Sequence, residues 1–415
     1  MSCRQPCLAM RGVGRRVKSV PYRVLHVHGG GGLGGVELWL ANLARLTDPA
    51  EFELHIAAAE FLPHEPIAFQ RYGAAVIDRR LPRRPPGLVV QLHRILQQHG
   101  PYDAVHAHLS FNNGFVLAAA KASGVPVRIA HSHTDSGPLS KTIGRSAYSA
   151  LCRKLIQLTA THGLAASATA AADLFGPHWI SDPRWHVHPC GIDLEPFACA
   201  VDRKLVRSEL GIPATAIVVG HVGRFSEEKN HRFLFQIGKL LLRRRPDVYF
   251  LLVGDGPARP AIMRAFSESG FAGRVILPGN RRDVPRLMRG AMDAFVFPSL
   301  YEGLGLAVIE AQAAALPCII SGSIPREVDL IPELVTRFSL TVAPSLWADQ
   351  IETALSGAKY SPEVAQALLS GSRFNVVNEV EELQTLYREW VHPAGSPVAS
   401  RVLSPLPRDR GEAPR

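Results

Sequence analysis

Two cationic side chains flank a turn that directly follows an apolar stretch of the 415-residue sequence, in the segment Val222–His231. Arg224 and Lys229 are close enough along the chain to converge on the same phosphate oxygens, which positively charged side chains bind strongly. Neutralising charge there would help a nucleoside diphosphate to leave. Either cation alone is also typical of an exposed, solvated turn, so the pair needs support from other motifs.

A second motif places two carboxylates around the start of an apolar helix. The glycines within Leu300–Ala311 predict a turn that enters this helix, with Glu302 on the loop and Glu310 inside the helix. Carboxylates accept hydrogen bonds from vicinal hydroxyls, so the two groups suit a ribose and a hexose. Paired glutamates also fit glycoside hydrolysis at a suitable carboxyl separation, and either one alone fits a charge interaction at a helix terminus.

A glycine-rich loop, His28–Gly35, follows one predicted strand and precedes an apolar helix. Free backbone amides and the helix N-terminus make such a loop an anion site suited to a diphosphate. The loop also satisfies the dinucleotide-binding pattern through Gly29, Gly31 and Gly34, which keeps an NAD-dependent oxidoreductase as an alternative. That pattern fits the loop in more than one register, and the next strand, Leu54–Ala59, lacks the terminal acidic residue that the alternative requires.

Three His-x-His pairs occur in the first half of the chain, namely His26 with His28, His106 with His108, and His131 with His133. Alternate residues share one face of a strand, so each pair could act together. Because zinc binds imidazole and activates water, the pairs leave a metallohydrolase as a further alternative. No acidic ligand motif accompanies them in the sequence, and a structural or substrate-contacting histidine is the commoner case at a strand end. We therefore expect neither a metal nor a cofactor.

Short apolar runs alternate with helix-like segments along the chain, which predicts parallel sheets covered by helices. The first series of runs comprises Arg23–His28, Glu53–Ala58, Ala104–His108 and Val127–Ala130. The second series comprises Ala216–Gly220, Val248–Val253, Arg274–Leu277, Ala294–Phe297 and Cys318–Ile320. Because the strand pattern restarts, the sequence predicts an α/β protein with two Rossmann-like domains.

The predicted domain boundary lies near residue 190, because the segment His188–Phe197 contains Pro and Gly residues that break regular structure. Apolar side chains spaced through Glu379–Val391 predict an amphipathic terminal helix. The predicted division is a basic disordered extension 1–21, a first domain 22–190, a second domain 191–375, a terminal helix 376–391 and a disordered tail 392–415.

The composition is that of a globular protein, with 47% hydrophobic and 20% charged residues. The sequence shows no apolar stretch long enough to cross a bilayer and no apolar core of a signal peptide, which favours a cytoplasmic location. The six cysteines lack C-x-x-C spacing, so we expect neither disulfides nor a zinc site from them. Most of the net charge of +10 comes from the two tails. A basic nucleic-acid-binding protein remains an alternative, although the body shows no recognition motif.

Together these motifs resemble the family-4 glycosyltransferases, which adopt the GT-B fold and retain the anomeric configuration. The resemblance rests on the order and spacing of Arg224 with Lys229, the turn Gly254–Pro257, the segment Arg282–Pro285, and Glu302 to Glu310. It covers roughly residues 22–391, since the glycine loop, the crossover and the terminal helix also look like their counterparts. It implies two domains that face a central cleft, with the C-terminal helix returning to the first domain.

The resemblance also implies roles for single residues. Arg224 and Lys229 would bind the donor pyrophosphate, Glu310 the ribose hydroxyls, and Glu302 the transferred sugar. A histidine that follows the strand predicted at Val127–Ala130 would contact the donor near the reacting carbon.

His133 is favoured for that histidine, with His131 as the neighbouring candidate. The other positions expected to contact the donor are Gly34, Gly35, Gly254, Asp255, Gly256, Arg282, Asp283, Val284, Gly303, Leu304, Gly305 and Leu306.

The implied reaction transfers a hexose from a UDP- or GDP-sugar to a saccharide or lipid-linked acceptor with retention, in the biosynthesis of a bacterial surface polysaccharide. The expected partners are the nucleotide sugar and the acceptor, not a nucleic acid. Basic residues among apolar ones suit a helix that contacts the inner leaflet of the membrane, and they are Lys141, Arg145, Arg153 and Lys154. Ordinary packing of this helix against the first-domain sheet is equally consistent with the pattern.

Overall fold

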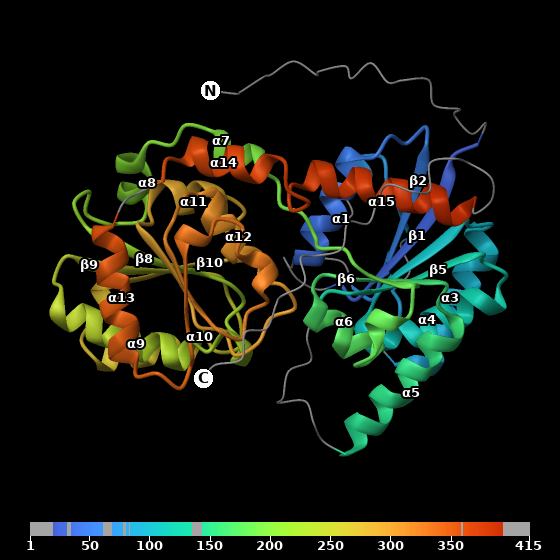
Figure 1. Cartoon of the computed structure of the whole chain (residues 1–415), viewed down its shortest axis with the longest axis horizontal. Helices are drawn as coiled ribbons and strands as arrows, with labels where there is room; N and C mark the ends of the chain where they lie inside the picture. Colours follow the sequence, from blue (N-terminus) through green and yellow to red (C-terminus); the bar gives the residue numbers. More distant parts are fainter. Residues whose placement is uncertain are drawn as a thin grey trace, which may run out of the picture.

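The computed structural model describes residues 20–30, 35–60, 69–77, 80–82, 84–134, 143–357 and 360–392, without the side chains of residues 143–145. Two bodies lie side by side, and each is built on a parallel β-sheet with helices packed against it (Figure 1). The prediction of an α/β protein with two Rossmann-like domains is confirmed. Nearly all of the predicted N-terminal extension and C-terminal tail lies outside the described residues.

The first sheet has seven strands in the order β3-β2-β1-β4-β5-β6-β7. Its strands are β1 (Tyr22–His28), β2 (Phe52–Ala58), β3 (Ala75–Ile77), β4 (Ala104–His108), β5 (Val127–Ser132), β6 (His162–Ala165) and β7 (Trp185–Val187). Helices of this domain include α1 (Gly35–Leu46), α3 (Pro85–His99), α4 (Asn113–Ala122), α5 (Ile143–Thr159) and α6 (Ala168–Phe175). The strand order reverses between β1 and β4, so their carboxyl ends form a topological switch point, where ligands of such sheets bind.

The second sheet has six strands in the order β10-β9-β8-β11-β12-β13. Its strands are β8 (Ile217–Val222), β9 (Val248–Val253), β10 (Val275–Gly279), β11 (Ala294–Phe297), β12 (Cys318–Ser321) and β13 (Val335–Phe338). Its helices include α7 (Glu195–Ala198), α8 (Arg203–Glu209), α9 (His231–Arg244), α10 (Arg259–Glu268), α11 (Val284–Gly290), α12 (Leu306–Ala313), α13 (Pro344–Ser356) and α14 (Pro362–Ser370). Here the order reverses between β8 and β11, which sets a second switch point.

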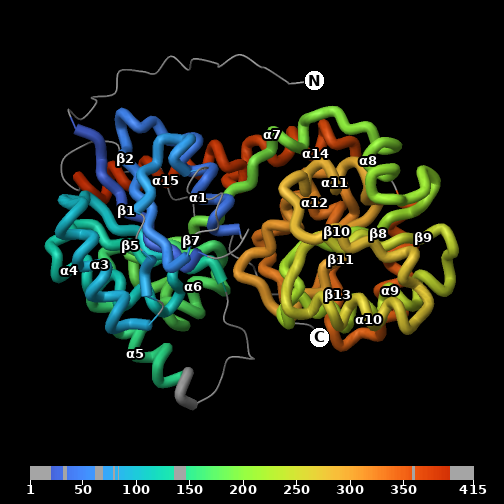
Figure 2. Tube along the Cα trace, turned by 180° about the vertical axis from the view of Figure 1, so that it is seen from behind, coloured from blue at the N-terminus to red at the C-terminus, as the bar shows by residue number. Residues whose placement is uncertain are grey.

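The chain passes between the two bodies twice, at neighbouring positions. On the way out, the Ile192 amide donates to the Phe374 carbonyl at 2.7 Å, and on the way back the Val376 amide donates to the Ile192 carbonyl at 3.0 Å. After the second crossing, α15 (Val376–Val391) runs back along the first body, as the view from behind also shows (Figure 2). The prediction that the terminal helix returns to the first domain is therefore confirmed.

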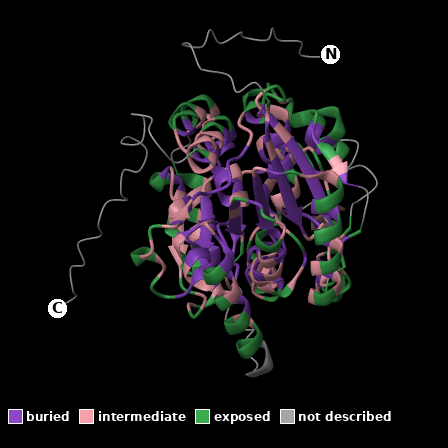
Figure 3. Ribbon diagram, turned by 90° about the vertical axis from the view of Figure 1, so that its right-hand side faces the viewer, coloured by how far each residue is buried: buried purple, intermediate pink, exposed green. Residues whose placement is uncertain are grey.

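Helix α15 completes the core of the first domain. Its apolar face carries Val376, Val380, Leu383, Leu386 and Tyr387, and these side chains pack in one cluster with apolar residues of α1, β1 and β2. Burying each side chain of this size contributes roughly 1.5–3 kcal/mol. The strands of both sheets are likewise mostly buried, while the exposed residues lie on the outer faces of the helices (Figure 3).

One carboxylate is buried at the contact between α15 and the first domain. Glu379 accepts hydrogen bonds from Trp39 Nε1 at 2.9 Å and from His188 Nε2 at 2.7 Å. Burial alone would lower the pKa of His188, but the carboxylates of Glu379 and Glu382 outweigh that effect and raise it to about 9. The crossover segment is thus tied to the terminal helix by a buried ion pair.

Helix α5 extends away from the body of the first domain (Figures 1 and 3). It exposes Leu151 and Leu158, whose exposed fractions are 54% and 57%, and Lys154 is also exposed. Within the described residues, no helix combines the length and the apolar character needed to cross a membrane.

The predicted basic face of this helix is only partly present among the described side chains. Arg153 donates to the carbonyls of Asp173 and Leu174, so it packs against α6 instead of facing outward. Lys141 and the side chain of Arg145 lie outside the described part of the chain.

Candidate active site

The loops that follow β8 and β11 bring a cation and a carboxylate into contact at the switch point of the second sheet. Lys229 Nζ lies 2.6 Å from Glu302 Oε1, and the two side chains retain exposed fractions of only 15% and 11%. The same Nζ lies 4.8 Å from the centre of the Phe297 ring. Residues that are 73 positions apart in the sequence therefore form one ion pair at the edge of the sheet.

Local backbone geometry holds Lys229 in place. The short helical turn Glu227–Lys229 ends at Asn230, which adopts a left-handed conformation with φ of 53° and caps α9 by accepting from the Phe233 amide. Asparagine tolerates this conformation better than most residues. The cap stops the turn and starts α9 one residue after Lys229, so the side chain is fixed at the sheet edge.

Helix α12 begins beside this ion pair. Gly305 precedes it with φ of 99°, a conformation that glycine adopts without strain, and a Cβ on Gly305 would lie 3.9 Å from Glu302 Cγ. Glu310 lies inside the helix, as predicted, and burial raises the pKa of its carboxyl to about 7, although the residue keeps some exposed surface. The carboxyl of Glu310 therefore titrates near neutral pH. Leu304, on the loop before the helix, is buried.

The turn after β9 approaches the loop after β8 closely because of two glycines. A Cβ on Gly254 would lie 1.9 Å from the Gly223 carbonyl oxygen, and one on Gly256 would lie 2.5 Å from the Phe225 carbonyl oxygen. Asp255 is exposed, and its backbone carbonyl accepts from the Phe225 amide at 2.9 Å. This turn thus lies directly beside the loop that carries Arg224.

The segment after β10 contributes three further predicted positions at the same edge of the sheet. Arg282 is exposed, and Val284 begins α11. Asp283 is held by Arg281 through two contacts of 2.8 Å, and these hydrogen bonds lower the pKa of its carboxyl. Within the described residues, none of the three forms a hydrogen bond or an ion pair with Lys229 or Glu302. They therefore lie at the periphery of the ion pair.

The first domain is in close contact with these loops. A Cβ on Gly303 would lie 2.1 Å from the His133 carbonyl oxygen, and a Cβ on Gly35 would lie 3.3 Å from Leu306 Cδ1. The Ser167 hydroxyl, at the start of α6, donates to the Gly303 carbonyl. The loop 302–306 is therefore pressed against the first domain, where glycine at position 303 makes room for the contact.

A pocket of about 390 Å³ opens between the domains. It is lined by first-domain residues and by one second-domain side chain, Arg224, and the full lining is His28, Gly29, Gly30, Ala59, Leu81, Pro82, Leu88, Leu109, Asn112 and Arg224. The glycine loop and one of the predicted phosphate-binding cations thus share a cavity. Gly34 lies outside the described residues.

His131 is the penultimate residue of β5, and His133 directly follows the strand, next to the contact with Gly303. His131 is fully buried, whereas His133 is half-buried and donates or accepts at 2.8 Å with His108 and at 3.3 Å with the Cys190 thiol. Burial, together with neighbouring histidines, lowers the pKa of His133 to about 3 and that of His131 well below its usual range. Both imidazoles are therefore neutral at physiological pH, and His133 is the one nearer to the cleft.

Two cleft contacts were not singled out in the sequence. Ser167 caps α6 and reaches Gly303, and Glu327 accepts from the Ala168 amide at 2.9 Å from the opposite domain. The sequence signal for Ser167 is a serine between a short apolar run and an alanine-rich helix, which is typical of a helix cap. Such a cap indicates the start of a helix, not a contact between domains.

We call the set His28, Gly29, Gly30, Gly35 and His133 the first-domain wall, and Arg224, Lys229, Glu302 and Glu310 the second-domain wall. The second-domain wall carries charges suited to a diphosphate and to hydroxyl groups. The first-domain wall offers backbone amides and the neutral imidazole of His133. This arrangement suits a ligand that has both phosphates and a sugar.

Comparison with known proteins agrees with that geometry. Residues 33–196 match the family model described as Glycosyltransferase Family 4, and residues 216–357 match the model described as Glycosyl transferases group 1. The chain is 35% identical over 377 residues to EpsF of Bacillus subtilis (strain 168), named as a glycosyltransferase, with 88% of this chain and 96% of that protein covered.

More distant similarities extend the comparison. The chain is 31% identical over 241 residues to UDP-Gal:alpha-D-GlcNAc-diphosphoundecaprenol alpha-1,3-galactosyltransferase of Escherichia coli, which covers 56% of this chain and 61% of that protein. The crystal structure of Anabaena HepE in complex with UDP-glucose is similar in fold, with a TM-score of 0.72, 21% identity, and coverage of 88% of this chain and 99% of that one. The chain belongs to the family-4 glycosyltransferases, and its two facing domains form the GT-B fold.

Proposed function

We propose that the protein transfers a hexose from a UDP- or GDP-sugar to a saccharide or lipid-linked saccharide, with retention at the anomeric carbon, during synthesis of a bacterial surface polysaccharide. The names of the relatives support the substrate classes. The Escherichia coli relative is named for a UDP-sugar donor and a diphosphoundecaprenol-linked acceptor, and HepE is described in complex with UDP and with UDP-glucose.

The observation that carries the proposal is the ion pair of Lys229 with Glu302, placed opposite the first-domain wall. A donor diphosphate carries more negative charge than one carboxylate, so it competes for the Lys229 ammonium. Glu302 is then free to accept hydrogen bonds from the hydroxyls of the transferred sugar. Donor binding thus replaces Glu302 by the diphosphate as the partner of Lys229. Without a donor, Glu302 neutralises the Lys229 ammonium.

Charge on the leaving diphosphate is the main quantity that this site has to stabilise. Lys229 and Arg224 supply positive charge, and the amides at the start of α12 and of α1 point in the direction favourable to anions. Such stabilisation needs no covalent bond to the protein. His133 would contact the donor sugar as a neutral group, because burial lowers its pKa to about 3.

The acceptor would enter the pocket between the domains. Its apolar lining of Leu81, Pro82, Leu88 and Leu109 suits the flat face of a sugar ring or a lipid-linked group, while Asn112 offers hydrogen bonds. We also propose that the exposed residues of α5 touch the membrane surface, where a lipid-linked acceptor is held. Leu151, Leu158 and Lys154 supply the apolar and basic contacts for that role.

Ligand-induced stabilisation tests the donor class. Because a ligand that binds only the folded protein raises its melting temperature, UDP or GDP should raise it and NAD should not. The base that stabilises the protein then selects the sugar nucleotides for a transfer assay with short saccharide and undecaprenyl-diphosphate acceptors, and the anomeric configuration of the product is read by NMR. Stabilisation by NAD alone, or an inverted product, would overturn the corresponding part of the proposal.

A further inference from the structure

The densest group of nitrogen ligands in the described chain lies behind the first-domain wall. Strands β1 and β4 each carry two histidines on one face of the sheet, and β5 carries His131, with His133 just beyond its end. Strand pairing places His26 directly opposite His106. His26 and His106 are fully buried, and His108 is 8% exposed. Histidines are seldom gathered in this way, because each buried imidazole needs a partner for its nitrogens.

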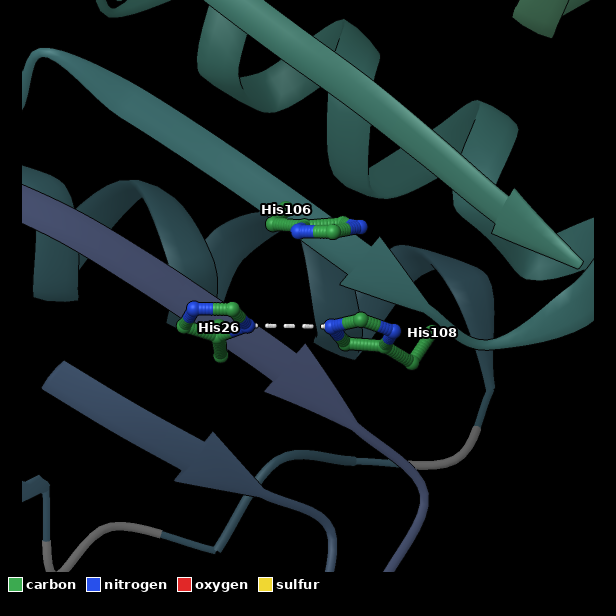
Figure 4. Close-up of side chains that lie close together, drawn as sticks. All are labelled: His26, His106 and His108. Carbon is green, nitrogen blue, oxygen red and sulfur yellow. Dashed lines mark hydrogen bonds between the residues drawn. The ribbon is translucent and has the colours of Figure 1, made fainter. Parts of the chain in front are cut away.

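Three of these imidazoles lie close together. One ring nitrogen each of His26, His106 and His108 lies within 4.8 Å of the other two, and Figure 4 shows His26 and His108 facing each other with the His106 ring beside them. The shortest pair is His26 Nδ1 and His108 Nε2, which are 3.1 Å apart. In a tetrahedral zinc site with Zn–N bonds of about 2.0–2.1 Å, neighbouring ligand nitrogens lie about 3.4 Å apart. The His26 and His108 nitrogens are thus slightly closer than in such a site, and their rings would have to turn to place an ion between them.

An aromatic side chain encloses part of the cluster. The Trp39 ring packs edge-on against His106 and His108 and shields them from water.

The outer nitrogens of the three rings already have partners, as they do in metal sites where a second layer of groups fixes each ligand. His106 Nδ1 lies 2.6 Å from the Tyr387 hydroxyl, which also lies 3.5 Å from His26 Nε2. His108 Nδ1 lies 2.8 Å from His133 Nε2. Burial raises the pKa of Tyr387 well above its usual value, so its hydroxyl stays neutral. The inner nitrogens have partners as well. His26 Nδ1 faces His108 Nε2, and His106 Nε2 lies 3.1 Å from His131 Nδ1, so a bound ion would replace these two contacts.

We propose that His26, His106 and His108 bind one divalent transition-metal ion, with zinc as the reference ion, as a structural site behind the cleft. Three imidazoles occupy three positions of a tetrahedral ion and leave the fourth for another ligand. The ion would join β1 to β4 at the switch point. It would also fix the proton of His108 on Nδ1 and thereby set the orientation of His133. This inference departs from the expectation of a metal-free chain and does not depend on the proposed transfer reaction.

A second triad shares one member with the first. His108, His131 and His133 also bring one nitrogen each within 4.8 Å of the others. We assign the ion to the first triad because all its members are buried and each outer nitrogen has a partner, whereas His133 is half-buried and faces the cleft.

Metal content is the first test. The full chain, purified through a tag without histidines from cells grown with added zinc, should retain about one ion per chain after dialysis against a chelator, as measured by mass spectrometry. Growth with cobalt in place of zinc should give the visible absorption of a tetrahedral ion. Protein that is folded and holds less than about a tenth of an ion per chain would overturn the proposal.

Variants test the assignment to this triad. His26→Gln and His106→Gln should each lose the ion, while the matched control His55→Gln should retain it, since His55 is buried in the same sheet but bonded to Glu53 and Tyr102. His133→Gln should also retain the ion. Retention in His26→Gln together with loss in His133→Gln would place the ion on the second triad and overturn the assignment. If a variant does not fold, the metal content of the unaltered chain still decides whether an ion is bound.

Discussion

The two walls of the cleft are built by opposite electrostatic means. The second-domain wall presents charged side chains, and its central ion pair of Lys229 with Glu302 remains partly open to solvent. The first-domain wall is backed by imidazoles that burial holds neutral, as the lowered pKa values of His131 and His133 show. In the proposed function, the charge that binds the diphosphate therefore comes from one wall, while the other wall supplies shape and backbone amides.

The largest effect is expected where the charged wall is broken. Lys229→Ala should lower kcat/KM for sugar transfer by about 10²–10³-fold, because it removes positive charge that the leaving diphosphate needs. Circular dichroism and the melting temperature should show an intact fold. Lys204→Ala, on an exposed position of α8, is the matched control and should leave kcat/KM unchanged. Equal turnover of the two variants would contradict the role given to the second-domain wall.

The buried charge pair of His188 with Glu379, on the first-domain side, should show itself in the stability of the protein. Glu379→Gln should destabilise the protein by about 3 kcal/mol below pH 6.5, since His188 would lose its partner. The pKa of His188 is raised to about 9, so the stability that the pair contributes is fully present below the ordinary value of 6.5 and is lost as the pH rises through 9.

Urea unfolding of the unaltered protein and of Glu379→Gln at pH 6 and pH 9.5 measures this difference. The gap between the two should shrink at the higher pH. Glu382 also faces His188, at 3.7 Å, and remains in both proteins. A gap of constant size would show that the lost interaction is a hydrogen bond alone.

Glu310 should give a pH dependence of the same sign in a lower pH range. Its pKa is raised to about 7 from the ordinary 4.5, so the folded protein binds the proton more tightly than the unfolded chain does. Stability should therefore fall as the pH rises from 4.5 to 7, by up to about 3 kcal/mol and less where solvent reaches the carboxyl.

Glu310→Gln should abolish this fall, because the amide does not ionise. Melting temperatures at pH 5 and pH 8 compare the two proteins, and the variant should be the more stable one only at pH 8. Parallel curves would mean that the carboxyl is not held in a buried environment.

The smallest expected effect concerns the contact between the walls. Gly303→Ala places a methyl group against the backbone of His133, so the walls must separate, and transfer should fall about tenfold. Gly273→Ala is the control, because a Cβ at that position meets nothing within 4 Å. Normal activity of Gly303→Ala would show that the cleft does not need this close contact during transfer.

Much of the fold follows from local pattern. The runs predicted at Ala104–His108, Val248–Val253 and Ala294–Phe297 coincide with β4, β9 and β11, since each is a continuous apolar stretch of a buried parallel strand. Strands β3, β6, β7 and β13 have only three or four residues and were not predicted. Segments as short as β7 (Trp185–Val187) carry too few residues to show a period.

The candidate site divides in the same way. The placement of Glu302 on a loop and of Glu310 in a helix could be predicted, because turn and helix signals are local. The contact of Lys229 with Glu302 and the diagonal bonds between histidines of β1, β4 and β5 could not. These contacts depend on the order of the strands within each sheet. On the side of β1 that faces the centre of the first sheet, the neighbouring strand is β4, which is not the next strand in the chain.

The return of α15 has a consequence for biosynthesis. Translation delivers β1 and α1 early, but the residues that cover their apolar faces, 376–391, leave the ribosome only after the whole second domain. The first domain therefore cannot finish folding on its own as a nascent unit, unlike most N-terminal domains. Truncation before Val376 leaves Trp39, Leu43 and Phe52 uncovered, so premature stops should give insoluble protein instead of a shorter active one.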